Sequence, residues 1–101
     1  MQLTNRNNNQ YRITVEQLEP TKQTLMFEFE DREDLFALVD NMKKGSELDN
    51  ASSTRLAVAL RLFGPLVIAH RKHPLFIDFM PSFKVFMNNL KKRIKSVAAA
   101  N

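Results

Sequence analysis

The chain of 101 residues contains no cysteine, which excludes disulfide bonds, thiol nucleophiles and any zinc or iron–sulfur site built on cysteine. Glycine is also scarce, because only Gly45 and Gly64 are present. Neither lies in a glycine-rich loop that cradles phosphate, and no serine has the flanking glycines of a nucleophile elbow. Phosphate-cradling loops and catalysis by such a serine are therefore excluded.

Long hydrophobic runs are absent as well. The apolar run Leu66–Ala69, like every other uninterrupted apolar run in the chain, is far too short to cross a bilayer. Residues 1–10 are polar and lack the apolar segment of a secretory signal peptide. Because the lack of cysteine also gives no sign of an oxidising compartment, we expect a cytoplasmic protein.

The composition is that of a small globular protein with a mild excess of positive charge. The residues are 44% hydrophobic and 26% charged, and the net charge is +4. We expect one α+β domain over residues 10–97, with flexible tails at residues 1–9 and 98–101. A domain of this size buries a limited share of its surface, which favours help from a partner subunit.

Two segments in which apolar and polar residues alternate predict β-strands on either side of Pro20. Their apolar positions are Tyr11, Ile13 and Val15 in the first segment and Leu25, Phe27 and Phe29 in the second. An antiparallel hairpin with an aromatic inner face follows from this pattern. The connection is not one of the tight Asn-Gly turns, so the register stays open.

Three helices are predicted after the hairpin. The acidic segment Asp31–Asp34 indicates the cap and first turn of a helix that ends with a left-handed cap at Gly45. The next helix is apolar over much of its circumference, and Gly64-Pro65 predicts a kink or a break in it. Pro81 marks the start of the last helix. The predicted fold class is therefore α+β, in the order ββααα.

The hairpin suggests how copies of the chain assemble. A two-stranded hairpin is marginal in water unless helices cover it or further strands join it. The second strand presents a free edge of backbone donors and acceptors. Pairing of that edge with a second copy gives a four-stranded sheet, so we predict a homodimer.

Two blocks of the sequence resemble a known family. The segments Tyr11–Lys22 and Arg71–Pro81 are similar to the two recognisable blocks of a small, uncharacterised bacterial family classed as a domain of unknown function. The resemblance extends over about residues 10–95. It implies a small bacterial cytoplasmic protein, and it carries no activity, cofactor or catalytic residue.

Candidate metal and acid–base chemistry centres on His70, His73 and Asp78, because imidazole and carboxylate groups hold metals and titrate. We favour a different interpretation, a solvated basic helix end with His73 packed on Phe76. The acidic run Glu28–Asp34 lacks the spacing of a calcium loop. We therefore predict no metal, no cofactor and no catalytic residue.

A basic cluster supports an alternative function, weak nucleic-acid binding. Its members lie in the last helix and are Lys91, Lys92, Arg93 and Lys95. No aromatic residue is interleaved with them for base stacking, so we favour a solvated helix face.

The leading hypothesis uses the apolar segment near the last helix, because five of the eight phenylalanines lie between Phe63 and Phe86. We predict a non-enzymatic protein-interaction or assembly module that binds through an apolar helical surface and a strand edge. The apolar anchors are predicted to be Phe76, Phe79, Met80 and Phe83, and the polar rim Arg71, Lys72 and His73.

Overall fold

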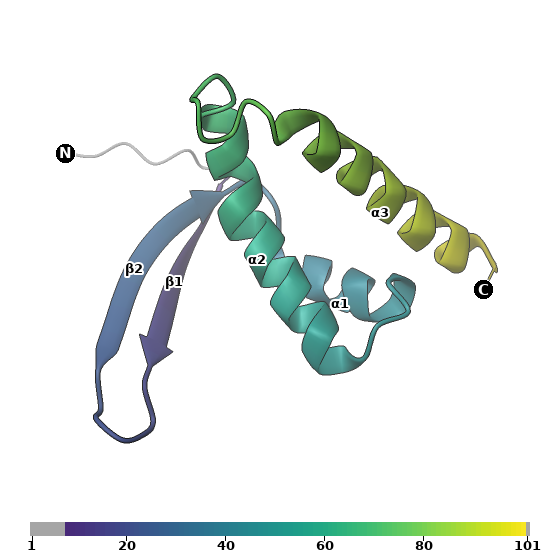
Figure 1. Cartoon of the computed structure of the whole chain (residues 1–101). Helices are drawn as coiled ribbons and strands as arrows, with labels where there is room; N and C mark the ends of the chain where they lie inside the picture. Colours follow the sequence, from purple (N-terminus) through teal and green to yellow (C-terminus); the bar gives the residue numbers. More distant parts are fainter. Residues whose placement is uncertain (1–7, 101) are drawn as a thin grey trace. The chain divides into compact units, whose positions relative to one another are not determined.

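The computed structural model describes residues 8–100, and the side chains of residues 8–97. The elements follow in the order β1, β2, α1, α2, α3 (Figure 1), so the predicted ββααα order and α+β class are confirmed. The chain divides at Asp34 into two compact units, which we call the hairpin unit and the helical unit and describe separately. Most of the predicted N-terminal tail lies outside the described residues. The prediction of a single domain stays a prediction.

The hairpin unit consists of β1 (Asn9–Glu16) and β2 (Thr24–Asp31), which pair antiparallel. Apolar residues face one another across the strands, in the pairs Tyr11–Phe29, Ile13–Phe27 and Val15–Leu25. The prediction that these apolar side chains share one face of the hairpin is confirmed, and the register that the sequence left open is now defined. Val15, Leu25 and Phe27 are exposed on that face. On the opposite face Arg12 forms an ion pair with Glu28 at 2.7 Å.

The start of α1 (Leu35–Gly45) differs from the sequence prediction. The acidic residues before it do not form its first turn, because Asp31 still belongs to β2. The Asp31 carboxylate accepts a hydrogen bond from the Glu33 main-chain N–H at 3.0 Å. This local turn gives the Glu33 N–H group a hydrogen-bond acceptor outside a helix, and the helix therefore begins later, at Leu35.

The predicted left-handed cap at Gly45 is wrong. Neither glycine has a positive φ, and the left-handed residue is Glu47, with φ of 66°. Gly45 is needed for a different reason. A Cβ atom at this position would lie 2.9 Å from the Cα atom of Ile94, so the end of α1 touches the backbone of α3. Glycine here permits close helix packing.

The helix α2 (Asn50–Ala69) continues through Pro65, so the alternative of a break is wrong. The residue before Pro65, Gly64, has no Cβ atom to collide with the proline ring, which removes one of the two steric conflicts that disfavour a helical residue before proline. A kink at this point stays a prediction. The helix α2 is also long and apolar enough to cross a membrane. This criterion uses length and composition alone, and the core helix of a soluble protein can meet it too.

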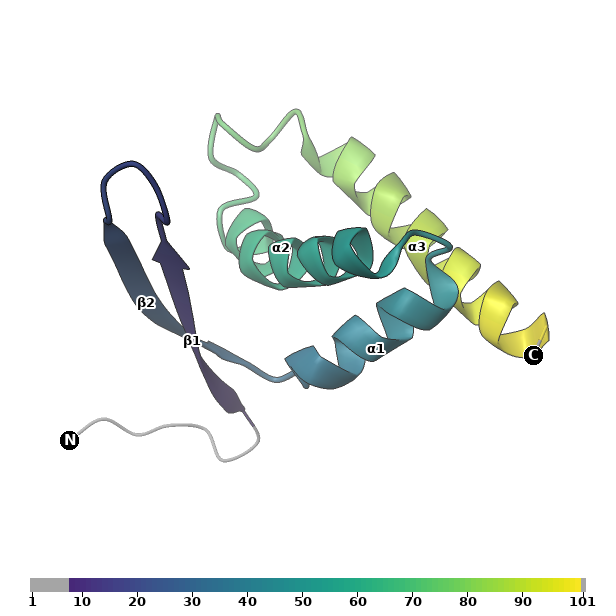
Figure 2. The same ribbon diagram turned by 90° about the horizontal axis from the view of Figure 1, so that it is seen from below.

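The third helix, α3 (Met80–Ala100), begins one residue before Pro81. In the helical unit α1 packs against both α2 and α3 (Figure 2). The buried apolar residues of the described chain are few: Leu35, Met42, Ala57, Val67 and Phe83. All of them lie in the helical unit, which therefore has a small core.

Candidate interaction surface

The segment between α2 and α3 is a series of hydrogen-bonded turns. The main-chain N–H of His73 donates to the carbonyl of His70 at 2.9 Å, and that of Phe76 donates to His73 at 2.9 Å. The N–H of Met80 then donates to Phe76 at 3.1 Å and leads into α3. The segment therefore positions its side chains through its own backbone.

Four phenylalanines form a cluster where this turn meets the two helices. The ring centroid of Phe63, on α2, lies 6.3 Å from that of Phe76, 5.9 Å from that of Phe79 and 6.4 Å from that of Phe83. The rings of Phe79 and Phe83 are 5.7 Å apart. These separations are typical of tilted and edge-to-face aromatic packing, which holds the turn between α2 and α3.

The cluster is buried on one side and open on the other. Phe83 is 6% exposed and belongs to the core, so it supports the cluster from beneath and does not present itself to a partner. Phe79 and Phe63 are each 40% exposed, and Phe76 and Met80 are half-buried. We call the open side, formed by Phe63, Phe76, Phe79 and Met80, the aromatic surface.

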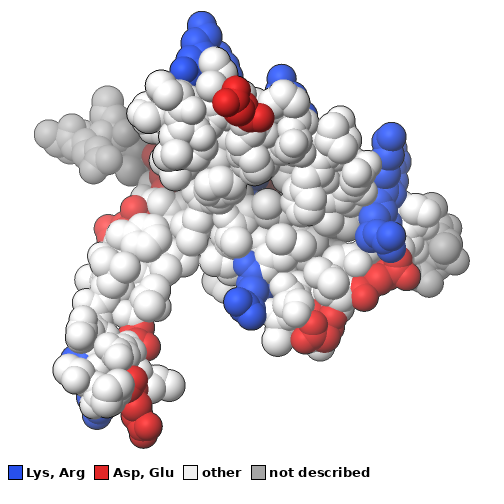
Figure 3. Space-filling view, viewed as in Figure 1, with Lys and Arg blue, Asp and Glu red and all other residues white. Residues whose placement is uncertain are grey.

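Further apolar side chains are exposed nearby along the same segments. They are Leu66 and Ile68 on α2, Leu75 and Ile77 in the turn, and Val85 and Phe86 on α3. Uncharged residues cover most of the visible face of the helical unit in Figure 3, and lysine and arginine lie at its margins. These exposed apolar side chains therefore lie on the same three segments that form the aromatic surface.

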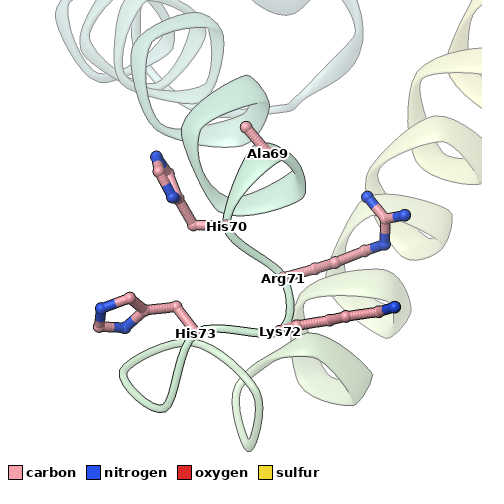
Figure 4. A pocket seen from close by; sticks show the side chains of 5 residues that line it. All are labelled: Ala69, His70, Arg71, Lys72 and His73. Atoms are coloured by element: carbon pink, nitrogen blue, oxygen red, sulfur yellow. The ribbon is translucent and has the colours of Figure 1, made fainter.

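The predicted polar rim lies in one turn but faces two ways. Figure 4 shows His70 and His73 on one side of an open hollow and Arg71 and Lys72 on the other. The rings of His73 and Phe76 are 6.3 Å apart, so the predicted packing of His73 on Phe76 is confirmed. The guanidinium of Arg71 donates to the carbonyl of Ile68 at 3.1 Å, where a cation suits the C-terminal end of α2.

The histidines are not assembled with a carboxylate. The main-chain N–H of Leu75 donates to Nδ1 of His73 at 3.1 Å, which places the proton of a neutral ring on Nε2. In the described part of the chain, no group of three or more histidine and acidic side chains lies close enough to hold a metal. The acid–base and metal hypothesis for His70, His73 and Asp78 therefore gains no geometric support.

Hydroxyl groups near the start of α2 have structural roles. Ser53 is fully buried, and its Oγ lies 3.0 Å from that of Ser46. The N–H of Leu48 donates to Ser46 Oγ at 3.1 Å, and Ser53 Oγ donates to the Leu48 carbonyl at 3.4 Å. These bonds form a closed ring that fixes the connection between α1 and α2, so neither serine is placed as a nucleophile.

The basic cluster of α3 is only partly free. Arg93 forms an ion pair with Glu47, in the connection between α1 and α2. Lys91, Lys92 and Lys95 are exposed. Charge is also divided unevenly, because 11 of the 15 lysines and arginines, but only 4 of the 11 acidic residues, lie in the helical unit.

The observed architecture, an antiparallel hairpin followed by three helices, is that of a small α+β protein. The chain belongs to the family described as Domain of Unknown Function with solved-structure structure (DUF3861), which matches residues 9–92. The predicted family relationship is confirmed.

A solved structure has the same fold. It is the crystal structure of a protein of unknown function (eca1910) from Pectobacterium atrosepticum, which is 40% identical to this chain. The match covers 84% of this chain and 98% of that chain, with a TM-score of 0.79. No match was found among curated proteins.

Sequence reasoning missed the exposure of Phe63. Its helical spacing with Leu56, Leu60 and Val67 predicts a core position, but its ring faces the turn instead. The available signal was the second stripe of α2, because Ala59, Phe63 and Leu66 also recur at helical spacing and all three are exposed.

Proposed function

We propose that the protein is a non-enzymatic interaction or assembly module of the cytoplasm. In this proposal the aromatic surface holds a protein partner, with Phe76, Phe79 and Met80 as apolar anchors and His73 at the rim. Arg71 and Lys72 supply positive charge on the other side of the same turn. A free strand edge of the hairpin supplies a second interface.

One observation carries the proposal: a single copy exposes more large apolar side chains than it buries. In the described residues, ten such side chains of the helical unit are exposed, whereas its buried apolar core has five members. Only 22% of the most apolar stretch of α2 is buried. Large exposed apolar patches mark protein-interaction surfaces, and this supports such a role for the exposed side chains around the aromatic surface.

The composition of the aromatic surface suits this role. Phenylalanine and methionine are enriched at the buried centres of interfaces, where each ring removes a large apolar area from water. Two of the rings are already fixed by contacts with Phe83, at 5.7 Å from Phe79 and 6.4 Å from Phe63. Anchors held in this way lose little side-chain entropy when a partner binds.

The proposal is tested by photo-crosslinking in the cells that produce the protein. The photoreactive residue p-benzoyl-phenylalanine replaces Phe79, and in the control variant it replaces Asn88, an exposed polar position of α3. We expect irradiation to give discrete protein adducts from position 79 and few from position 88. Equal labelling at the two positions, or none at either, contradicts a partner on the aromatic surface.

The alternative function is weak binding of nucleic acid along α3. It is supported by the positive charge of the helical unit and by the exposed Lys91, Lys92 and Lys95. Binding of this kind weakens steeply with salt, whereas apolar association changes little. Replacing Lys91 and Lys92 with glutamate should abolish the affinity for nucleic acid and leave crosslinking at Phe79 intact.

A further inference from the structure

The main-chain groups on the open edges of the hairpin can be assigned residue by residue. The N–H of Gln17 donates to the carbonyl of Gln23 at 2.8 Å, so these two form a hydrogen-bonded pair. Hydrogen-bonded and non-hydrogen-bonded pairs alternate along an antiparallel ladder. Thr14 and Met26, which face each other, therefore form a non-hydrogen-bonded pair. Their N–H and C=O groups point outward, away from the partner strand.

The two open edges thus present equivalent backbone groups. On β1 the outward positions are Gln10, Arg12, Thr14 and Glu16, and on β2 they are Thr24, Met26, Glu28 and Glu30. The sheet has two strands in the part of the chain that the structure describes. Both edges are templates for a further strand, so the side chains decide which edge pairs with another copy.

Charge distinguishes the edges. On β2 the charged side chains at the outward positions are Glu28, which pairs with Arg12 of the same copy, and Glu30. On β1 the charged residues are Arg12 and Glu16, which have opposite signs. Self-pairing of β1 about Thr14 therefore brings unlike charges together, whereas self-pairing of β2 over Thr24–Asp31 brings no positive side chain to its carboxylates.

We propose that two copies of the chain pair antiparallel through β1, about a two-fold axis at Thr14. In this register Arg12 lies opposite Glu16 of the second copy, and Ile13 lies opposite Val15 of the second copy on the apolar face. The sheet then has four strands in the order β2-β1-β1-β2. This inference rests on the proposed function, because it names the partner and the strand for the edge interface.

The same arrangement improves the apolar face of the hairpin. In a single copy Val15 is 54% exposed and Leu25 is 61% exposed. Pairing through β1 places Ile13 of each copy opposite Val15 of the other copy, so two such pairs form. Pairs of β-branched residues are favourable across neighbouring strands. It also converts a marginal two-stranded hairpin into a sheet of four strands.

Two matched proline variants of the full chain test the proposal. Thr14→Pro removes an outward N–H from β1, and Met26→Pro removes the facing outward N–H from β2, so neither breaks the hairpin ladder. Sedimentation equilibrium measures the dimer, and far-UV circular dichroism measures folding. We expect a dimer for the wild type and Met26→Pro, and a monomer for Thr14→Pro at the same micromolar concentration.

A second pair of variants tests the same interface if a proline variant does not fold. Glu16→Arg places an arginine opposite Arg12 of the second copy at two symmetric positions, which should raise the dimer Kd about tenfold. Glu30→Arg makes the same charge change on the outer edge of β2 and should leave the Kd unchanged.

Three results overturn the inference. They are a monomeric wild type, a dimer that only the changes on β2 disrupt, and a dimer that neither set of variants affects. The last result indicates face-to-face packing or another surface. A monomeric wild type that still crosslinks at Phe79 refutes the β1 dimer and leaves the proposed helical interface standing. A β1 dimer without crosslinks at Phe79 supports the pairing through β1 and refutes the proposed helical interface.

Discussion

Replacement of Gly45 by alanine tests the contact between α1 and α3. An added Cβ atom would lie 2.9 Å from Cα, 3.0 Å from Cγ2 and 3.2 Å from Cβ of Ile94. The nearest atom belongs to the backbone of α3, so the conflict is relieved only if one helix moves. Overpacking of this kind costs about 1–3 kcal/mol.

Helix propensity acts in the opposite direction. Alanine is favoured over glycine inside a helix by about 1 kcal/mol, and this gain is smaller at the last residue of α1. The steric cost is therefore larger than the gain, and we expect Gly45→Ala to lower the free energy of unfolding by about 1–2 kcal/mol. Propensity alone predicts a change of the opposite sign.

Urea denaturation followed by far-UV circular dichroism measures this difference as a shift of the midpoint at constant slope. The protein concentration must be the same throughout, because the proposed dimer would make stability concentration-dependent. Asn41→Ala, at an exposed position of α1, is the matched control and should be neutral or slightly stabilising. An unchanged or raised midpoint for Gly45→Ala refutes the close approach. Full rescue by Ile94→Ala refutes the assignment of the conflict to the backbone.

Three further changes test other parts of the helical unit. Pro65→Ala restores a helical N–H inside α2 and should raise the free energy of unfolding by about 1–3 kcal/mol, whereas a decrease in denaturation experiments indicates a packing role for the proline ring. Ser53→Ala removes the buried hydroxyl that joins Ser46 Oγ to the Leu48 carbonyl and should cost about 1–3 kcal/mol, so an unchanged urea midpoint contradicts the structural role of these hydroxyl groups. The Ser52 hydroxyl holds the pKa of Asp49 below its ordinary value. The stabilisation by Asp49 is therefore complete above the pKa of the unfolded state and is lost as the pH falls through the lowered pKa of the folded state. Asp49→Asn should show a smaller fall in thermal midpoint between neutral and acidic pH than the wild type, and an identical fall removes Asp49 from the acid response.

The hairpin was predictable because alternation along a strand places side chains on two faces. Tyr11, Ile13 and Val15 therefore identified their face without knowledge of their partners. The register was not predictable, because the connection around Pro20 is not a turn that specifies one alignment. The register and the hydrogen bond from Gln17 to Gln23 together show that the main-chain groups of Thr14 and Met26 point outward.

The helices were predictable as elements but not at their ends. Asp31 is acidic and precedes a helix, yet its side chain forms a local turn with Glu33, a competition that composition does not reveal. Gly45 follows two lysines as a C-terminal cap does. Its actual role depends on Ile94, which is distant in sequence.

The candidate surface was predictable as a segment and not as a set of exposed atoms. Phe76, Phe79 and Phe83 have similar sequence surroundings, and the sequence pattern predicts that all three belong to one apolar surface. The structure separates them, because Phe83 lies beneath Phe63 and Phe79 whereas these two rings remain open. The burial of each ring depends on how α2, the turn and α3 pack together, which the sequence pattern does not specify.

The central claim is that the protein assembles through surfaces that a single copy leaves open, and the outward N–H groups of the hairpin report this directly. Residue-resolved hydrogen exchange by NMR compares Thr14 on β1 with Met26 on β2 in the full-length wild type. Pairing of two copies through β1 predicts slow exchange at Thr14 that becomes faster on dilution, and fast exchange at Met26 at every concentration. Fast exchange at both positions, or protection at Met26 alone, would contradict it.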